Sequence, residues 1–203
     1  MIKRMFDIFA VSIGIVLLSP FLLIIGLWIK FDSEGPVIFS QIRVGRYGVP
    51  FRIHKFRTMR VGSEGHGQLT IGHDARVTRS GKYLRKSKLD ELPQLFDVFV
   101  GKMSIVGPRP EVQKYVDYYP TEVKHEILSV RPGISDRASI EMVNENFILG
   151  QYTDPENAYI DIILPIKQKY YLEYVRNHSF IGDIVIILGT IRKLCSSSPK
   201  KHV

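Results

Sequence analysis

The residues best suited to chemistry are two adjacent carboxylates, Asp90 and Glu91, with basic side chains just upstream of them. Pro93 limits where a helix can begin, because a proline deeper inside a helix clashes with a carbonyl and removes a hydrogen bond. We therefore predict that Asp90 is the N-cap of a helix with Pro93 in its first turn. Apolar residues at spacings of three and four predict the buried face of that helix: Leu92, Leu95, Phe96 and Phe99.

Two interpretations of the acidic pair are open at this point. Acidic residues are enriched at helix N-termini, where they cap free N–H groups and complement the helix dipole. An ionised aspartate is also a ready nucleophile, because with an ordinary pKa of about 3.9 it needs no general base at neutral pH. The rest of the chain must decide between a cap and a catalytic site.

The N-terminal region contains an apolar segment, residues 8–29, with no charged side chain. About 20 apolar residues are needed to cross the bilayer core. The segment is too long for a cleaved signal peptide, so we expect a retained membrane anchor. Ser19 and Pro20 interrupt it, which leaves two topologies open: a kinked span and a helix–break–helix hairpin that re-enters the same face. Basic residues at both ends favour two cytoplasmic ends.

Composition narrows the class of partner. The chain has 203 residues and a formal net charge of +8, which suits nucleic acid, phospholipid or a phosphorylated substrate. We expect no nucleic acid, because it would not explain the apolar segment and the sequence has no recognition helix or aromatic platform motif. The single cysteine, Cys195, fits a protein facing the reducing cytoplasm. A non-enzymatic basic membrane scaffold is the alternative to an enzyme.

Beyond the anchor, the pattern predicts an α+β domain that is mainly helical, with a short β-hairpin. The expected segments are a strand at 37–39, a turn at 45–50, a strand at 51–56, a loop at 62–72 and helices at 160–175 and 180–193. The last helix is either an interfacial amphipathic helix or a core helix. Asp183 within it needs a partner in both cases, because an unpaired carboxylate among apolar residues is costly.

Several cations are placed to meet phosphate oxygens. Arg109 lies between two prolines, whose stiffness would hold a guanidinium in a fixed position, and Arg131 precedes a proline in a similar turn. Lys55 and Arg57 flank an apolar strand residue, Phe56. A structural turn or a solvated face would also explain these arrangements, so none of them is diagnostic alone.

Taken in order, these motifs resemble the bacterial sugar transferases known as small monotopic phosphoglycosyl transferases. The resemblance covers nearly the whole chain, and several motifs in the right order are more specific than any one of them. The motifs are Lys3-Arg4 with Asp7, Ser19-Pro20, Lys55-Phe56-Arg57-Thr58-Met59, Leu89-Asp90-Glu91-Leu92-Pro93-Gln94-Leu95, Met103-Ser104-Ile105-Val106-Gly107-Pro108-Arg109-Pro110 and Arg131-Pro132-Gly133-Ile134.

The resemblance implies an activity. In that family the aspartate matching Asp90 attacks the β-phosphorus of a nucleoside-diphosphate sugar, usually a UDP-sugar, and UMP leaves. The phosphosugar then passes from the aspartyl intermediate to a polyprenyl phosphate, typically undecaprenyl phosphate, as the first membrane step of polysaccharide or glycoconjugate assembly. The matching glutamate, Glu91, assists with the required Mg²⁺. Asp90 and Glu91 are therefore the expected catalytic pair and the expected metal site.

The resemblance also implies an arrangement at the bacterial inner membrane. Ser19 and Pro20 would turn the anchor back to the cytoplasmic face, so that residues 1–34 form a re-entrant anchor. Residues 35–195 would form the catalytic domain, facing the cytoplasm, and residues 196–203 a flexible tail. The implied partners are a UDP-sugar, a polyprenyl phosphate and the phospholipid membrane, and a homodimer is compatible with them.

A carboxylate that approaches a diphosphate meets like charge, so a divalent cation and basic side chains must neutralise the site. We assign Arg85, Arg109 and Lys55 to the phosphates, with Arg57 and Arg131 as weaker candidates. The chain departs from the best-known members after Ile134, where it lacks their asparagine-glycine-arginine-asparagine run. Arg137 is a candidate to compensate. Asn144-Glu145-Asn146 has no assigned role, and the sequence does not name the sugar.

Overall fold

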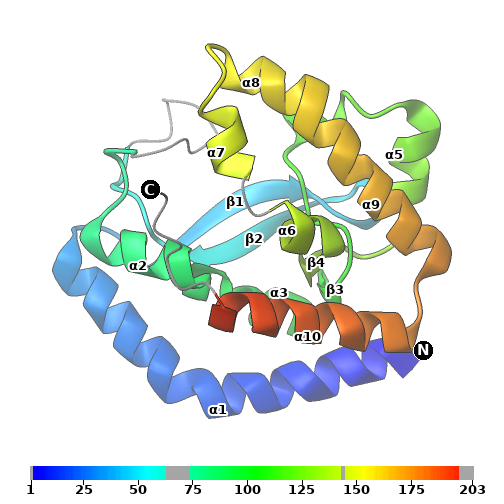
Figure 1. The fold of residues 1–203 in the computed structure, drawn as a ribbon. Helices are drawn as coiled ribbons and strands as arrows, with labels where there is room; N and C mark the ends of the chain where they lie inside the picture. Colours follow the sequence, from blue (N-terminus) through cyan, green and yellow to red (C-terminus); the bar gives the residue numbers. More distant parts are fainter. Residues whose placement is uncertain (1, 63–73, 143–144, 197–203) are drawn as a thin grey trace.

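The computed structural model describes residues 2–62, 74–142 and 145–196, and it is mainly helical with two small sheets (Figure 1). The predicted loop at 62–72 and the predicted tail fall almost entirely outside these ranges. The elements are α1 (Ile2–Asp32), β1 (Ile38–Val44), β2 (Pro50–Phe56), α2 (Arg79–Ser87), α3 (Gln94–Phe99), β3 (Ser104–Val106), α4 (Gln113–Val116), α5 (Thr121–Ile127), β4 (Gly133–Ser135), α6 (Arg137–Glu141), α7 (Glu145–Leu149), α8 (Pro155–Ala158), α9 (Leu164–Asn177) and α10 (Phe180–Ser196).

The predicted anchor forms one continuous helix, α1, rather than two helices with a break between them. Pro20 has no N–H to donate to the carbonyl of Val16, four residues earlier, and such a loss normally kinks a helix. The hydroxyl of Ser19 donates to that same carbonyl at 2.8 Å, so the oxygen keeps a donor. Figure 1 shows that α1 bends midway along its length. Among the described residues, α1 is the helix that is long and apolar enough to cross a membrane.

The predicted β-hairpin is confirmed. β1 and β2 pair antiparallel, from Ile38 opposite Phe56 to Val44 opposite Pro50, and β1 is longer than predicted. Between them, Tyr47 and Gly48 have positive φ angles of 60° and 77°, which reverse the chain tightly. The hairpin ends with Lys55 and Phe56 close to the acidic pair.

A second sheet joins the two proline-flanked arginine segments. β3 and β4 pair in parallel, with Ser104 opposite Gly133 and Val106 opposite Ser135. A Cβ added at Gly133 would lie 2.1 Å from the nitrogen of Gly107, so a side chain at this position would force the segments apart. Arg109 follows β3 and Arg131 precedes β4, so their segments lie at opposite ends of the same small parallel sheet.

The apolar core of the described residues is divided among three clusters. The largest lies between α5, α8 and α9 and is rich in tyrosine. The other two pack under α1: Val11 of its N-terminal half meets Val98 and Met103, and Ile25 and Ile29 of its C-terminal half meet Phe56 and Leu84. Both halves of α1 thus bury residues against the same globular body.

The predicted C-terminal helices are present as α9 and α10. Pro165 lies in the first turn of α9, where a proline is tolerated, and the residues before it, Tyr159–Ile163, form a π-helical turn. Asp183 on α10 has the partners that its burial requires, because Lys3 Nζ lies 2.6 Å away and the Tyr174 hydroxyl 2.9 Å away. The first bond ties α10 to the N-terminus of α1, and the second ties it to α9.

Candidate active site

The acidic pair lies on a short 3₁₀ turn, Leu89–Glu91, between α2 and α3. The prediction that Asp90 caps α3 is wrong, because Pro93 occupies the N-cap position and Gln94 begins the helix. The extra turn forms because Lys88 adopts the left-handed conformation (φ 57°), which ends α2 and redirects the chain. Asp90 and Glu91 are held between two helices, and neither serves as a cap.

The predicted apolar face of α3 is confirmed for Leu92 and Leu95, which pack against core clusters, but is wrong for Phe96 and Phe99. The structure buries Gln94, Asp97 and Val98, whereas Phe96 and Phe99 are each 48% exposed. Asp97 turns this face inward, because its carboxylate accepts hydrogen bonds from the backbone N–H of His54 at 2.9 Å and lies 2.7 Å from the His54 ring Nδ1. A polar contact to the hairpin therefore sets the orientation of α3 and leaves its aromatic side chains outside.

Asp90 is a nearly buried carboxylate, 8% exposed, and none of the described side chains or backbone groups donates a hydrogen bond to its Oδ1. Burial raises the pKa of Asp90, and the neighbouring Glu91 carboxylate adds to the rise, while Lys55, Lys88 and Arg85 oppose it. The oxygen is shielded from solvent, and its capacity to accept a hydrogen bond is unused among the described residues.

Glu91 is held by two cations. Its Oε1 accepts from Lys55 Nζ at 3.0 Å and from Arg109 Nη2, and its Oε2 accepts from Arg109 Nη1 at 3.1 Å. Burial by itself would raise the pKa of Glu91, but Arg109 and Lys55 outweigh it and hold that pKa well below its usual range. Glu91 in turn raises the pKa of Arg109. The three side chains form a fixed, charged unit beside Asp90.

The structure thus brings together four of the predicted site residues: Asp90, Glu91, Lys55 and Arg109. Arg85 lies in the last turn of α2, close enough to Asp90 for its charge to lower the pKa of that carboxyl group. These five side chains come from β2, α2, the 3₁₀ turn and the loop after β3.

Arg57 does not join this group. It is buried, and its guanidinium donates to three backbone carbonyls in the turn that follows α1: Pro36 at 2.6 Å, Glu34 at 2.5 Å and Ser33 at 2.8 Å. All three of its nitrogens are engaged in holding that turn. We therefore withdraw Arg57 as a phosphate ligand.

Arg131 lies in a separate cleft near the N-terminus of α1, and the residues that line this cleft include none of Asp90, Glu91, Lys55 and Arg109. Its Nε donates to the carbonyl of Gly101 at 2.9 Å. Arg137, the candidate to replace the missing family arginine, is paired on an exposed surface with Glu173 of α9 at 2.6 Å. Neither side chain is in the group around Asp90.

Two residues near the acidic pair, Gln94 and Lys88, were not predicted from the sequence to shape the site. Gln94 is fully buried directly after the acidic turn, and both of its side-chain polar atoms are without a hydrogen-bond partner in the described chain. A polar residue in an otherwise apolar stretch is a signal that could have drawn attention to Gln94. The left-handed conformation of Lys88 could not be predicted in this way, because lysine has no preference for a positive φ angle.

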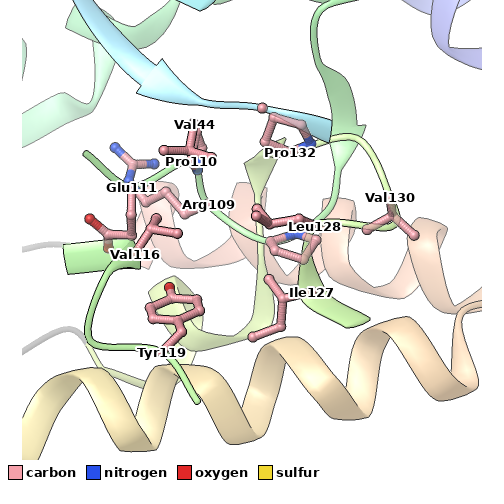
Figure 2. Close-up of a pocket in the computed structure, with 12 residues that line it drawn as sticks. Val44, Arg109, Pro110, Glu111, Val116, Tyr119, Ile127, Leu128, Val130 and Pro132 are labelled. Atoms are coloured by element: carbon pink, nitrogen blue, oxygen red, sulfur yellow. The ribbon is translucent and has the colours of Figure 1, made fainter. Parts of the chain in front are cut away.

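A buried polar network lies behind Arg109. Figure 2 shows Arg109 and Glu111 at a small pocket whose other walls include the apolar residues Val44, Val116 and Ile127. Glu111 accepts from the Tyr159 hydroxyl at 2.6 Å, and Lys167 donates to the same hydroxyl at 3.1 Å and to Glu145 at 2.9 Å. Glu145, which had no assigned role, thus forms the outer end of this network, whereas Asn144 lies outside the described residues.

Comparison with known proteins identifies the family. The sequence profile described as bacterial sugar transferase matches residues 1–197. The chain belongs to that family. The resemblance drawn from the motifs is therefore confirmed at the level of the family.

Named relatives are similar over almost all of this chain. A UDP-N-acetylgalactosamine-undecaprenyl-phosphate N-acetylgalactosaminephosphotransferase of Aeromonas hydrophila is 42% identical over 95% of the chain and 43% of its own length. A UDP-glucose:undecaprenyl-phosphate glucose-1-phosphate transferase of Klebsiella pneumoniae is 38% identical over 94% of the chain and 39% of its own length. The exopolysaccharide production protein PSS of Rhizobium leguminosarum bv. phaseoli is 36% identical over 94% of the chain and 93% of its own length. The chain thus spans about two fifths of the first two relatives.

Proposed function

We propose that this protein transfers a sugar 1-phosphate from a UDP-sugar to a polyprenyl phosphate and releases UMP, as an initiating step in polysaccharide assembly. The observation that carries the proposal is the buried Asp90 carboxylate, with an unpartnered Oδ1, beside a Glu91 held by Lys55 and Arg109. Family membership and the substrates named for the relatives support the choice of substrates.

The reaction has two displacements at one phosphorus atom. In the first, an oxygen of Asp90 forms a bond to the β-phosphorus, and the bond from that phosphorus to the bridging oxygen breaks, so that UMP leaves with the electron pair. In the second, an oxygen of the polyprenyl phosphate attacks the same phosphorus, and the bond to Asp90 breaks. Asp90 attacks as a carboxylate in the first step and leaves as a carboxylate in the second, where the nucleophile is the phosphate anion of the acceptor, so neither step requires a general base.

The cations around Asp90 lower the repulsion between its carboxylate and the diphosphate. Lys55 and Arg109 are held beside Asp90 by Glu91, where they would offset the negative charge that gathers on the phosphoryl oxygens. Because Glu91 already fixes these two side chains, little reorganisation is required when the substrate binds. Arg85 and Lys88 approach Asp90 from the end of α2 and add to the positive potential.

The family resemblance implies Mg²⁺, and the residues present fit it in part. The described chain contains no group of three or more His, Cys, Asp or Glu side chains that could hold a metal, but Mg²⁺ commonly uses one or two carboxylates with substrate phosphates and water. The unpartnered Oδ1 of Asp90 is a suitable ligand, whereas both oxygens of Glu91 are engaged. When bound, the ion would neutralise charge on the diphosphate. Asp90 would hold it, and Glu91, whose two oxygens are engaged by Lys55 and Arg109, would act beside it by keeping those cations in place.

We also propose that α1 is re-entrant and that both of its ends lie at the cytoplasmic face. At the N-terminal end Asp7 accepts from the Ser104 hydroxyl at 2.7 Å, and at the C-terminal end Ile29 packs against Phe56 and Leu84. A straight helix of 31 residues would be about 46 Å long and would carry one end to the far side of a bilayer. Contacts from both ends to one body, together with the bend, support the re-entrant arrangement.

UMP release tests the function directly. The full chain is incubated with Mg²⁺, polyprenyl phosphate and a panel of UDP-sugars, and at least one sugar should give UMP. Asp90→Asn should abolish release, whereas Asp117→Asn, which alters an exposed carboxylate, should leave it unchanged. Omitting the acceptor should leave a phosphosugar on the Asp90 peptide, detectable by mass. An adduct-free enzyme, or turnover by Asp90→Asn, would contradict the mechanism, and failure with every UDP-sugar would favour the scaffold.

Glu91→Gln tests the unit that holds the cations. The variant should lower UMP release by about 100-fold, because Lys55 and Arg109 lose their common anchor and a misplaced catalytic group is costly. The dependence on Mg²⁺ should also weaken. If the variant has the turnover number and the Mg²⁺ titration of the wild type, Glu91 neither positions the cations for catalysis nor assists with the metal.

A further inference from the structure

A basic cleft, separate from the candidate active site, opens where the N-terminus of α1 meets the end of α9. Its volume is about 270 Å³, and its walls come from α1, the hairpin turn, β3, the segment that leads to β4 and the end of α9. Four of the side chains that line it are cations: Lys3, Arg4, Arg46 and Arg131. We refer to these four residues and the space between them as the basic cleft.

Two of the four cations are committed to protein partners. Lys3 is paired with Asp183 at 2.6 Å, and Arg4 donates from its two terminal nitrogens to the carbonyls of Val98 at 2.7 Å and Phe99 at 3.0 Å. The carboxylate of the cleft, Asp7, is also engaged, with the Ser104 hydroxyl. These contacts fix the walls of the cleft and leave its carboxylate bound to a neutral group.

The other two cations retain free donors. Arg46 donates through Nε to the carbonyl of Ser129 at 2.7 Å, and Arg131 donates through Nε to that of Gly101 at 2.9 Å. No terminal nitrogen of either guanidinium has a hydrogen-bond partner within the described ranges of the chain. Each guanidinium is thus oriented by one hydrogen bond, and that of Arg46 also stacks over the Tyr47 ring at 4.4 Å from its centroid. Both still offer the paired N–H donors that recognise phosphate oxygens.

The charge of the basic cleft is unbalanced. Lys3 is already balanced by Asp183, so the guanidinium groups of Arg4, Arg46 and Arg131 share one carboxylate, Asp7. Arg4 and Arg131 are close enough to repel each other, and Asp7 offsets this in part. Bringing like charges together is unfavourable unless an anion lies between them. A phosphate group would supply that anion and would accept hydrogen bonds from Arg46 and Arg131.

The surroundings of the cleft suit an amphiphilic ligand. Beside it, α1 exposes Ile2 and Met5, and Phe6 packs edge-on against Phe180 of α10 at 5.2 Å between ring centroids. Ile181 on α10 is also exposed. If α1 lies in the membrane, the cleft is at the level of the lipid headgroups, next to surface that can contact acyl chains.

We propose that the basic cleft binds a phosphate-bearing anion, with Arg46 and Arg131 as its ligands, at a site distinct from Asp90. The phosphate can come from two sources, the headgroup of an anionic phospholipid or free phosphate in solution. The site does not depend on the transferase activity, because none of its residues touches the acidic pair. Binding should stabilise the fold by joining α1 to the segment that leads to β4.

The test measures thermal unfolding of the full chain in bilayer nanodiscs. One arm compares phosphatidylcholine with a mixture of phosphatidylcholine and phosphatidylglycerol, and the other adds inorganic phosphate to phosphatidylcholine nanodiscs at constant ionic strength. A ligand that saturates the cleft should raise Tm by about 5 °C. A rise with phosphatidylglycerol alone identifies a lipid headgroup, and a rise with inorganic phosphate identifies free phosphate.

The variants distinguish binding in the basic cleft from the general attraction between a basic protein and anions. Arg131→Gln and Arg46→Gln should each lose most of the rise, and Arg131→Lys should keep part of it. Arg52→Gln is the matched control, because it removes one exposed arginine charge outside the cleft and should keep the full rise. The proposal is overturned if neither probe raises Tm of the wild type, or if Arg131→Gln and Arg46→Gln respond as Arg52→Gln does.

Discussion

At the scale of single residues, the burial of Asp90 lowers the stability of the folded protein at the same position that the proposed reaction requires. The proposed chemistry requires an ionised carboxylate, yet Asp90 is nearly buried and none of the described groups donates a hydrogen bond to its Oδ1. Burial raises its pKa, so the fold favours the protonated form over the reactive one. The nearby cations reduce this penalty without removing it. A reactive group held in this way costs the protein stability at neutral pH.

We therefore expect Asp90→Asn to be inactive but more stable than the wild type. Because the pKa of Asp90 is higher in the folded state, its contribution to stability is present at low pH and is lost as pH rises through the folded-state pKa. The variant should gain about 1 kcal/mol at neutral pH, or a Tm rise of about 2–4 °C. The difference between the two proteins should vanish below about pH 4, the ordinary pKa of aspartate.

Thermal unfolding of both proteins across a pH series provides the measurement, and comparing them removes the effect of other titrating groups. Asp117→Asn, at an exposed carboxylate, should show no such difference at any pH. An Asp90→Asn protein that is less stable than the wild type at neutral pH would show that the buried carboxylate stabilises the fold.

The sequence could identify the acidic pair and two of its cations, because Asp90, Glu91, Lys55 and Arg109 lie in motifs whose residue types suit phosphate chemistry. It ranked Arg109 above Arg57 as a phosphate ligand but could not exclude Arg57. Both are arginines beside apolar residues, and what distinguishes them is three carbonyls of the turn after α1, which spacing along the chain cannot reveal. The engagement of Glu91 by both cations also depends on a tertiary contact.

At the scale of elements, α1 shows why a proline in an apolar segment is ambiguous. The sequence allowed a break at Ser19 and Pro20, but the structure has one helix that bends. A break would expose the carbonyl of Val16, whereas the Ser19 hydroxyl supplies the donor that Pro20 lacks. The choice between a break and a bend therefore depends on one side-chain rotamer, which residue types alone do not determine.

Pro20→Ala tests the role of the bend. The alanine restores the N–H donor to the Val16 carbonyl and relieves the ring clash, which together favour a straight helix by about 3 kcal/mol. A straight α1 cannot keep both ends against the same body, so we expect the N-terminus to move to the opposite side of the membrane in part of the population. The contact between Lys3 and Asp183 should be lost in those molecules.

Accessibility of an N-terminal tag in intact and inverted membrane vesicles provides the readout. In the wild type, the tags at both termini should be reached from the cytoplasmic side alone. Leu17→Ala, a change at an exposed residue of the same helix, should preserve that pattern. A Pro20→Ala protein with the wild-type pattern would show that the bend does not depend on the proline, and a wild-type N-terminus on the far side would mean a true span.

At the scale of the whole molecule, exposed apolar side chains gather on elements far apart in the sequence. They include Phe9 and Leu17 on α1, Phe96 on α3, and Val185 and Leu188 on α10. In Figure 1, α1 and α10 lie along the lower side of the molecule, and α7 and α8 lie at the top. The sequence left α10 as either an interfacial or a core helix. The structure has features of both, because Asp183 faces inward while Leu188 faces out.

The arrangement predicts that α10, as well as α1, contacts lipid. The chain has one tryptophan, Trp28, so in a Trp28→Phe background a single new tryptophan can report its own depth. Leu188→Trp, at a position 60% exposed on α10, should be strongly quenched by lipids with brominated acyl chains. Tyr152→Trp, between α7 and α8 and 45% exposed, is the matched control and should be quenched little. Equal quenching at the two positions would mean that the lower side of Figure 1 is not a membrane-facing surface. In that case α1 would be the sole contact with lipid, and the exposed residues of α10 would require another partner.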